Sequence, residues 1–196
     1  DHVDFKEVLA PTPFQDRVDS YSLTQDWASW NGYKTAKTYD TLASEYFAIR
    51  STCGVMDLTP MEKYRVGGPD ALHFLNRLVT RDISGLQPNR VTYVVWCNDE
   101  GKVLDDGTIF SLGGGEYRLC SQHHQFDWLL ISSLGFDVTI EEETHSIAAL
   151  AVQGPTSYSV LSAAGIQELN GLKPFGMINA RVNGIECMVS RTGFTG

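Results

Sequence analysis

The sequence is poor in positive charge and has no long apolar run. Its 196 residues include 15 Lys and Arg against 24 Asp and Glu, which gives a formal charge of −9. That balance opposes binding to nucleic-acid phosphates and to anionic lipid. No stretch approaches the roughly 18 apolar residues that a membrane-spanning helix needs, and residues 1–13 lack the basic and apolar segments of a signal peptide. We therefore expect no nucleic-acid partner and no membrane association.

Cysteine is scarce, and no two cysteines have the CxxC spacing. The four are Cys53, Cys97, Cys120 and Cys187. Three of them lie in apolar, strand-like runs, where a buried thiol behaves as a small hydrophobic group. Two disulfides are formally possible, but the wide spacing favours reduced thiols and a cytoplasmic protein.

Motifs for metal binding and covalent catalysis are also missing. The histidines form no HExxH, HxH or zinc-spaced His/Cys group, so no metal site is predicted; they are His2, His73, His123, His124 and His145. No GxSxG or SxxK motif is present. The pair His123-His124 fits either hydrogen bonding to water or a carbonyl, or a catalytic role. Residues 113–115 are three glycines without the Lys-Ser/Thr pair of a phosphate loop, and they are interpreted as a hairpin loop.

Hydrophobic periodicity predicts helices interleaved with short strands. Apolar residues at helical spacing predict helices over 40–50, 69–79, 125–134 and 155–164. Runs of β-branched and aromatic residues predict strands over 63–66, 91–97, 103–111, 116–121, 136–140, 146–152, 178–182 and 185–190. Turn residues at 98–101 and 183–184 predict antiparallel hairpins. This pattern is typical of an α+β fold with helices packed on antiparallel sheets, and not of a doubly wound parallel sheet.

Two adjacent carboxylates, Asp105 and Asp106, lie in the strand predicted over 103–111. Neighbouring side chains on a strand point to opposite faces, so one of the pair is directed toward the packed side of the sheet. A carboxylate there must be paired, hydrogen-bonded or protonated, which suits a group that binds an amine-bearing ligand. The alternative is that both residues cap turns.

Aromatic residues gather in the same region of the sequence. They are Tyr64, Tyr93, Trp96 and Phe110. Together with one buried acid they are consistent with a pocket for a flat heterocycle, and equally with an ordinary hydrophobic core.

Longer segments carry a family resemblance. They are Thr12-Pro13-Phe14, EYFAIR at 45–50, CGVMDL at 53–58, GPDA at 68–71, TRD at 80–82, CNDEGKVLDD at 97–106, LAVQGP at 150–155 and SRTGFTG at 190–196. In this order and spacing the chain resembles the tetrahydrofolate-dependent aminomethyltransferases, the family of the glycine cleavage system T-protein. The resemblance implies an α+β folate-binding domain built of ferredoxin-like lobes.

The resemblance also implies how the lobes are distributed along the chain. Residues 1–55 and 141–196 would form a first, split folate-binding lobe, and residues 56–140 an inserted second lobe. In the family, the motif at 190–196 continues with a Glu and a further C-terminal domain. We therefore expect that the sequence is the N-terminal part of a longer protein.

The resemblance assigns roles to particular residues. The functional acid of the family falls on Asp106, which would hydrogen-bond tetrahydrofolate near its reactive amines and assist proton transfer, while Asp105 would be structural. The implied cofactor-binding positions are Met61, Tyr93, Ser121, Phe175 and Phe194. Of these, Met61 and Tyr93 would pack around the pterin and benzoyl rings.

Three departures from the family pattern bear on the substrate. Ser121 stands where Asn is common, Phe194 where Tyr is usual, and Thr59-Pro60-Met61 where the family has Ser-His-Met. Because the folate acid is kept while polar neighbours change, the resemblance implies tetrahydrofolate as cofactor and leaves the one-carbon donor open. The expected partners are an amine, methoxy or methylsulfonium donor and a lipoyl carrier protein. The alternatives are a non-catalytic folate-binding paralogue of the iron–sulfur maintenance type, and a stable lobe without ligand affinity.

Overall fold

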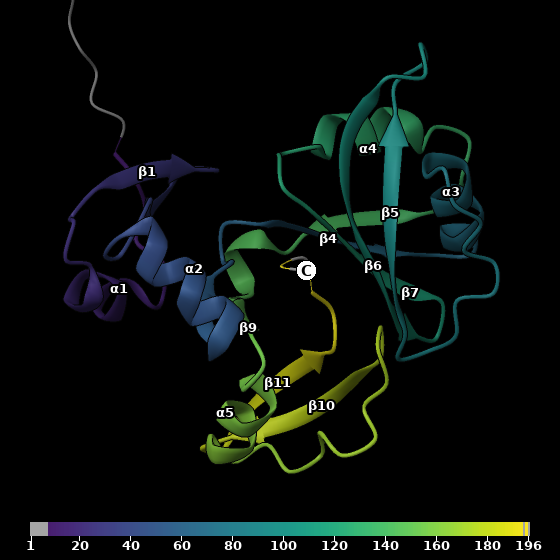
Figure 1. Ribbon diagram of the computed structural model, residues 1–196. Helices are drawn as coiled ribbons and strands as arrows, with labels where there is room; N and C mark the ends of the chain where they lie inside the picture. The colour runs from purple at the N-terminus through teal and green to yellow at the C-terminus, as the bar shows by residue number, and fades with distance from the viewer. Residues whose placement is uncertain (1–7, 194, 196) are drawn as a thin grey trace, which may run out of the picture. The chain divides into compact units, whose positions relative to one another are not determined.

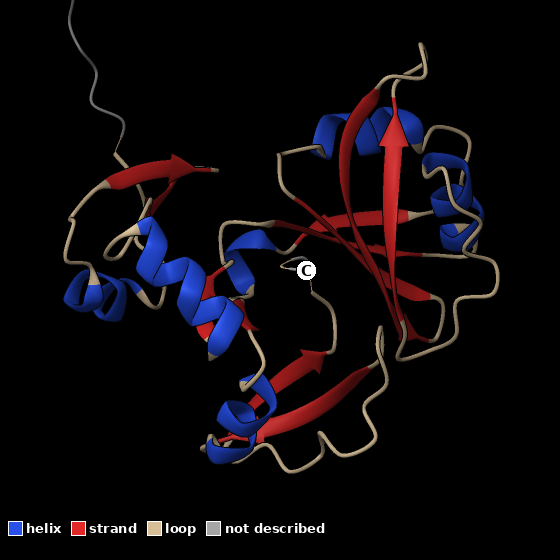
Figure 2. Cartoon of the chain, viewed as in Figure 1, coloured by secondary structure: helices blue, strands red, loops and turns tan. Residues whose placement is uncertain are grey.

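A computed structural model describes residues 8–193 and residue 195 (Figures 1 and 2). Within it the chain divides into two compact units: residues 1–60 with 148–157, and residues 61–147 with 158–196. The division into a split first lobe and a second lobe, with boundaries at 55/56 and 140/141, stays a prediction. Among the described residues, no helix is long and apolar enough to cross a membrane.

In its described residues, the first unit contains two helices and two small antiparallel sheets. The helices are α1 (Gln15–Tyr21) and α2 (Leu42–Ser51), and the first sheet pairs β1 (Trp27–Trp30) with β2 (Tyr33–Ala36). The second sheet pairs β3 (Gly54–Asp57) with β9 (Leu150–Gln153), although almost a hundred residues separate them in the sequence. The hydroxyl of Thr41 accepts a hydrogen bond from the backbone N–H of Ser44 and so caps the start of α2.

The second unit is built on a five-stranded antiparallel sheet in the order β5-β6-β7-β4-β8. The strands are β4 (Glu62–Gly67), β5 (Val91–Cys97), β6 (Val103–Gly113), β7 (Glu116–Ser121) and β8 (Thr139–Glu142). Helices α3 (Ala71–Leu78) and α4 (Phe126–Ser132) and the short 3₁₀ helix η1 (Thr144–Ser146) come between or after these strands. Helix α5 (Ser157–Ala163) leads to the hairpin β10 (Met177–Val182) and β11 (Ile185–Ser190).

The main core lies between one face of this sheet and helices α3 and α4 (Figure 2). Alternate residues of the strands point to this face, and the helices supply Phe74, Leu75 and Leu129, all fully buried. We call it the core face. A smaller cluster of Val91, Phe110 and Met177 packs on the opposite face, which we call the Asp106 face.

The observed class is the predicted one: an α+β fold whose named strand pairs are all antiparallel. Five elements were not predicted, namely α1, β1, β2, β3 and η1, and each is only three to seven residues long. Two predicted strands are shorter than expected. Residues 136–138 lie outside β8 because Asp137 exchanges backbone and side-chain hydrogen bonds with Asp70 at the start of α3. Residues 146–149 precede β9, and Ser146 ends η1.

Candidate functional site

The adjacent residues Asp105 and Asp106 point to opposite faces of the sheet, as strand alternation predicts. Asp105 pairs with Trp96 of β5 and is 5% exposed on the core face. Asp106 pairs with Val95 and is exposed on the Asp106 face. The two carboxylates therefore lie in different environments.

The buried carboxylate of Asp105 is satisfied entirely by its neighbours. One oxygen accepts the backbone N–H of Asp106 at 2.8 Å, and the other accepts the backbone N–H of His123 at 2.9 Å. The ring Nδ1 of His123 lies 3.4 Å from the same oxygen. Because hydrogen bonds to a buried carboxylate offset its desolvation, Asp105 fixes the strand and the loop after β7 and is not free to bind a ligand.

The exposed carboxylate of Asp106 has a tyrosine beside it. Tyr93 on β5 pairs with Thr108, and Asp106 lies two residues away on the same face. The Tyr93 hydroxyl forms a side-chain hydrogen bond with Asp106, which raises the pKa of Tyr93 because the phenol proton is held and the nearby negative charge disfavours the phenolate. This pair offers a ligand one acceptor carboxylate and one aromatic ring, 44% exposed.

This contact predicts a measurable change in tyrosine ionisation. Replacing Asp106 with Asn removes the negative charge, so the pKa of Tyr93 is expected to fall back toward its ordinary value near 10. Spectrophotometric titration of Asp106→Asn and the original protein, each compared with its Tyr93→Phe counterpart, isolates this residue among the eight tyrosines. An unchanged Tyr93 titration in Asp106→Asn would show that the two side chains do not interact.

Lys63 and Cys120 also lie on the Asp106 face. Lys63 on β4 pairs with Cys120 on β7, and its ammonium donates to the carbonyl of Met61 at 2.8 Å. Burial raises the pKa of Cys120 to about 11, although the cations of Lys63 and Arg118 act in the opposite direction. The thiol therefore stays protonated at neutral pH and is a poor nucleophile. The structure shows all four cysteines unpaired, in agreement with the prediction of reduced thiols.

The other predicted binding residues are distributed unevenly. Met61 is half-buried and immediately precedes β4. Phe175, 41% exposed with a φ of 56°, accepts the N–H of Val91 at the start of β5 and so lies beside the strand that carries Tyr93. Ser121 is fully buried on the core face, where its hydroxyl donates to the carbonyl of His123. Phe194 lies outside the described residues.

The structure thus brings Asp106 and Tyr93 together and does not bring Ser121 to the same face.

Sequence reasoning missed Lys63. By strand alternation its side chain lies on the Asp106 face, in a strand that is largely buried. A lysine inside a buried strand was the available signal, because such a residue is rarely found without a partner.

The sheet, the hairpins and the antiparallel pairing define an α+β domain of the type found in T-proteins. The structure matches the crystal structure of glycine cleavage system aminomethyltransferase T from Bartonella henselae with a TM-score of 0.77, at 23% identity over 94% of this chain and 50% of that chain. A heterotetrameric sarcosine oxidase from Corynebacterium sp. U-96 matches with a TM-score of 0.51, at 15% identity over 77% of each chain. These likenesses establish the fold.

The sequence comparisons establish the family. The family model of the GCVT N-terminal domain matches residues 18–196, and the chain belongs to this family. The aminomethyltransferase of Bacillus subtilis strain 168 is 33% identical over 195 residues, which cover 96% of this chain and 53% of that protein. The aminomethyltransferase of Caldanaerobacter subterraneus subsp. tengcongensis is 32% identical and is covered over 51% of its length. The chain therefore spans about half the length of the curated relatives it matches.

Proposed function

We propose that this chain provides the folate-binding part of a transferase that moves a one-carbon group from a small donor to tetrahydrofolate. The donor carries the group on an amine, methoxy or methylsulfonium centre. The observation that supports this most directly is the exposed carboxylate of Asp106 beside Tyr93, on a face of the sheet that buried Asp105 holds in place. Membership of the GCVT family supports tetrahydrofolate as the acceptor.

In this proposal the residues of the Asp106 face have separate roles in binding the folate and in proton transfer. Asp106 accepts a hydrogen bond from an amine of the folate and takes up or returns its proton as the one-carbon bond forms. Tyr93, Met61 and Phe175 contact the flat rings, since aromatic and thioether side chains favour such surfaces. The buried carboxylate of Asp105, which accepts the backbone N–H groups of Asp106 and His123, keeps Asp106 at a fixed position, and this reduces the entropy cost of reaching the reactive geometry.

The aminomethyltransferase relatives also suggest a protein partner. We propose a lipoyl carrier protein as the source of the one-carbon group if the donor is an aminomethyl group. A free methylated small molecule takes that place if the donor is a methoxy or methylsulfonium compound. A screen of donors of these three kinds with tetrahydrofolate distinguishes the two cases.

Calorimetric titration of tetrahydrofolate tests the cofactor directly. We expect one site with a dissociation constant in the low micromolar range, about −8 kcal/mol. Heat of binding without transfer from any of the three kinds of donor would favour the non-catalytic folate-binding alternative. Absence of binding would contradict the proposed function.

A further inference from the structure

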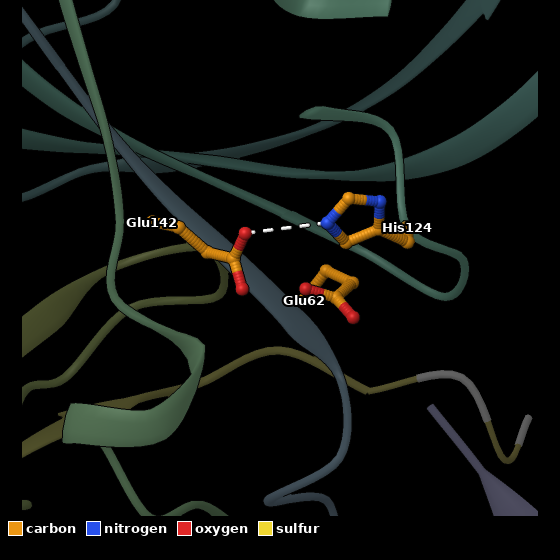
Figure 3. Close-up of side chains that lie close together, drawn as sticks. All are labelled: Glu62, His124 and Glu142. Atoms are coloured by element: carbon orange, nitrogen blue, oxygen red, sulfur yellow. Dashed lines mark hydrogen bonds and ion pairs between the residues drawn. The ribbon is translucent and has the colours of Figure 1, made fainter. Parts of the chain in front are cut away.

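Three side chains with metal-ligating atoms meet at the end of the sheet where β4 lies between β7 and β8 (Figure 3). Glu62 begins β4, Glu142 ends β8, and His124 lies in the loop between β7 and α4. Their ligand atoms all lie within 4.8 Å of one another. The three positions are far apart in sequence and form no spaced motif, so only the folded chain reveals the cluster.

Glu62 is the fixed member of the cluster. It is 4% exposed, and its Oε2 accepts a hydrogen bond from the hydroxyl of Thr144 at 2.8 Å. The Thr144 hydroxyl oxygen in turn accepts the backbone N–H of Lys63 at 3.0 Å. A carboxylate buried in this way is costly unless a cation or further hydrogen bonds accompany it. One carboxylate oxygen of Glu62 lies within 4.8 Å of ligand atoms of both His124 and Glu142 (Figure 3).

The loop that carries His124 is held on both sides of this residue. The N–H of His123 binds the carboxylate of Asp105 at 2.9 Å, and the N–H of Gln125 binds the hydroxyl of Tyr64 at 2.8 Å. The imidazole of His124 contacts the ring of Tyr64 edge-on, and its Nε2 lies 3.2 Å from Oε2 of Glu142. The imidazole is therefore directed at the carboxylates by its surroundings, as metal-binding histidines are.

The cluster brings the carboxylates of Glu62 and Glu142 together around a single imidazole. Within the described part of the chain, the ion-pair partners of Glu142 are the imidazoles of His124 and His145. His145 lies at the outer edge of the cluster, with its Nε2 4.0 Å from Oε1 of Glu142. A divalent cation at this place would offset both carboxylate charges.

We propose that Glu62, His124 and Glu142 bind one divalent cation of the zinc type. One imidazole nitrogen and two carboxylate oxygens are a donor set that suits Zn²⁺ or Co²⁺, with an open position for water. Ligand atoms around such an ion lie about 3.3 Å from one another. Those ligand atoms of the cluster that are farther apart than this must therefore move closer when the ion binds. The side chains of His124 and Glu142 are 54% and 26% exposed and are free to move inward, while Glu62 stays fixed.

This site is separate from the Asp106 face. The strand register puts Glu62 and Glu142 on the core face together with Tyr64, opposite Asp106. A bound ion would join β4, β8 and the loop that also supplies the backbone N–H of His123 to Asp105. The ion would thus stabilise the loop that supports the strand carrying Asp106, without contacting a ligand on the other face.

Metal titration of the chelator-treated, tag-free protein tests the proposal. We expect one equivalent of Zn²⁺ by calorimetry, a Co²⁺ spectrum without thiolate charge-transfer bands, and a zinc-dependent rise in Tm of about 5 °C. His124→Gln is expected to fold normally, because the side chain is half exposed, and to weaken zinc binding about tenfold or more. Glu62→Gln retains an oxygen that can accept the hydrogen bond from Thr144, so this variant is also expected to fold normally and to bind zinc about tenfold more weakly or worse.

The matched control is His73→Gln, an exposed histidine on α3. It is expected to bind zinc as the original protein does. Three results would overturn the proposal: no saturable binding, equal binding by the original protein and His124→Gln, or Co²⁺ bands that report cysteine ligands. In the first case His124 is simply an ion-pair partner of Glu142.

Discussion

Replacing Asp106 with Asn is expected to abolish one-carbon transfer while leaving the fold intact. The amide has the size and shape of the carboxylate, and Asp106 is exposed, so nothing in the core is disturbed. The amide cannot take up a proton or carry a negative charge, and removal of a general acid–base group lowers kcat by about 10² to 10⁴-fold. Single-turnover transfer to tetrahydrofolate, with the donor that the screen identifies, measures the effect. Tetrahydrofolate affinity is expected to fall as well, because a charge-assisted hydrogen bond is lost.

The control for this variant is Asp99→Asn. Asp99 is an exposed acid in the turn between β5 and β6 and does not lie on the Asp106 face. Its replacement by Asn removes one negative charge, as Asp106→Asn does. It is expected to keep full activity. Equal activity of Asp106→Asn and Asp99→Asn would remove Asp106 from the proposed mechanism, even if tetrahydrofolate binding persists.

Replacing Gly107 with Ala is expected to have the largest effect on stability. Gly107 follows Asp106 on β6 and pairs with Ser121 of β7. A Cβ atom there would lie 1.9 Å from the carbonyl oxygen of Cys120, and backbone on a central strand cannot move away easily. We expect a loss of about 3 kcal/mol or more in the free energy of unfolding, measured by denaturant titration.

A second glycine provides the comparison. Gly85 lies in the loop before β5, and a Cβ added to it meets nothing within 4 Å. Gly85→Ala is expected to change the free energy of unfolding by less than about 0.5 kcal/mol. If the two variants unfold at the same denaturant concentration, the close approach of β6 and β7 at Gly107 does not limit the fold.

The elements that sequence predicts well are those with strong periodicity. The strands β5, β7 and β11 lie at the predicted residues, and α3 lies within the predicted range. The missed elements are short, so few residues report their period. The hairpin of β1 and β2 turns at Asn31-Gly32, a dipeptide typical of hairpin turns, but its flanking strands have only four residues each and so carry little periodic signal.

The candidate site shows a similar limit. Strand alternation predicts that Asp105 and Asp106 separate to opposite faces, and the structure has them so. The hydrogen bond from the backbone N–H of His123 to Asp105 depends on the path of the loop after β7. Hydrophobic periodicity carries no information about that path. The same holds for the cluster of Glu62, His124 and Glu142, whose members come from three different segments. Contacts between distant segments depend on the register of the strands and on the paths of the loops. Neither can be deduced from the periodicity of a single sequence.

The pairing of β3 with β9 places a constraint on the order of folding. Closing the long intervening segment in an unstructured chain has a large entropy cost, and non-local pairs form slowly for this reason. The pairing of β4 with β8 lowers the part of that cost that remains for β3 and β9, because a backbone hydrogen bond of 2.7 Å then holds Lys63 and Glu143 together. Once β4 and β8 are paired, the chain segments that become β3 and β9 emerge as near neighbours. We therefore expect β3 and β9 to pair after β4 and β8 have paired.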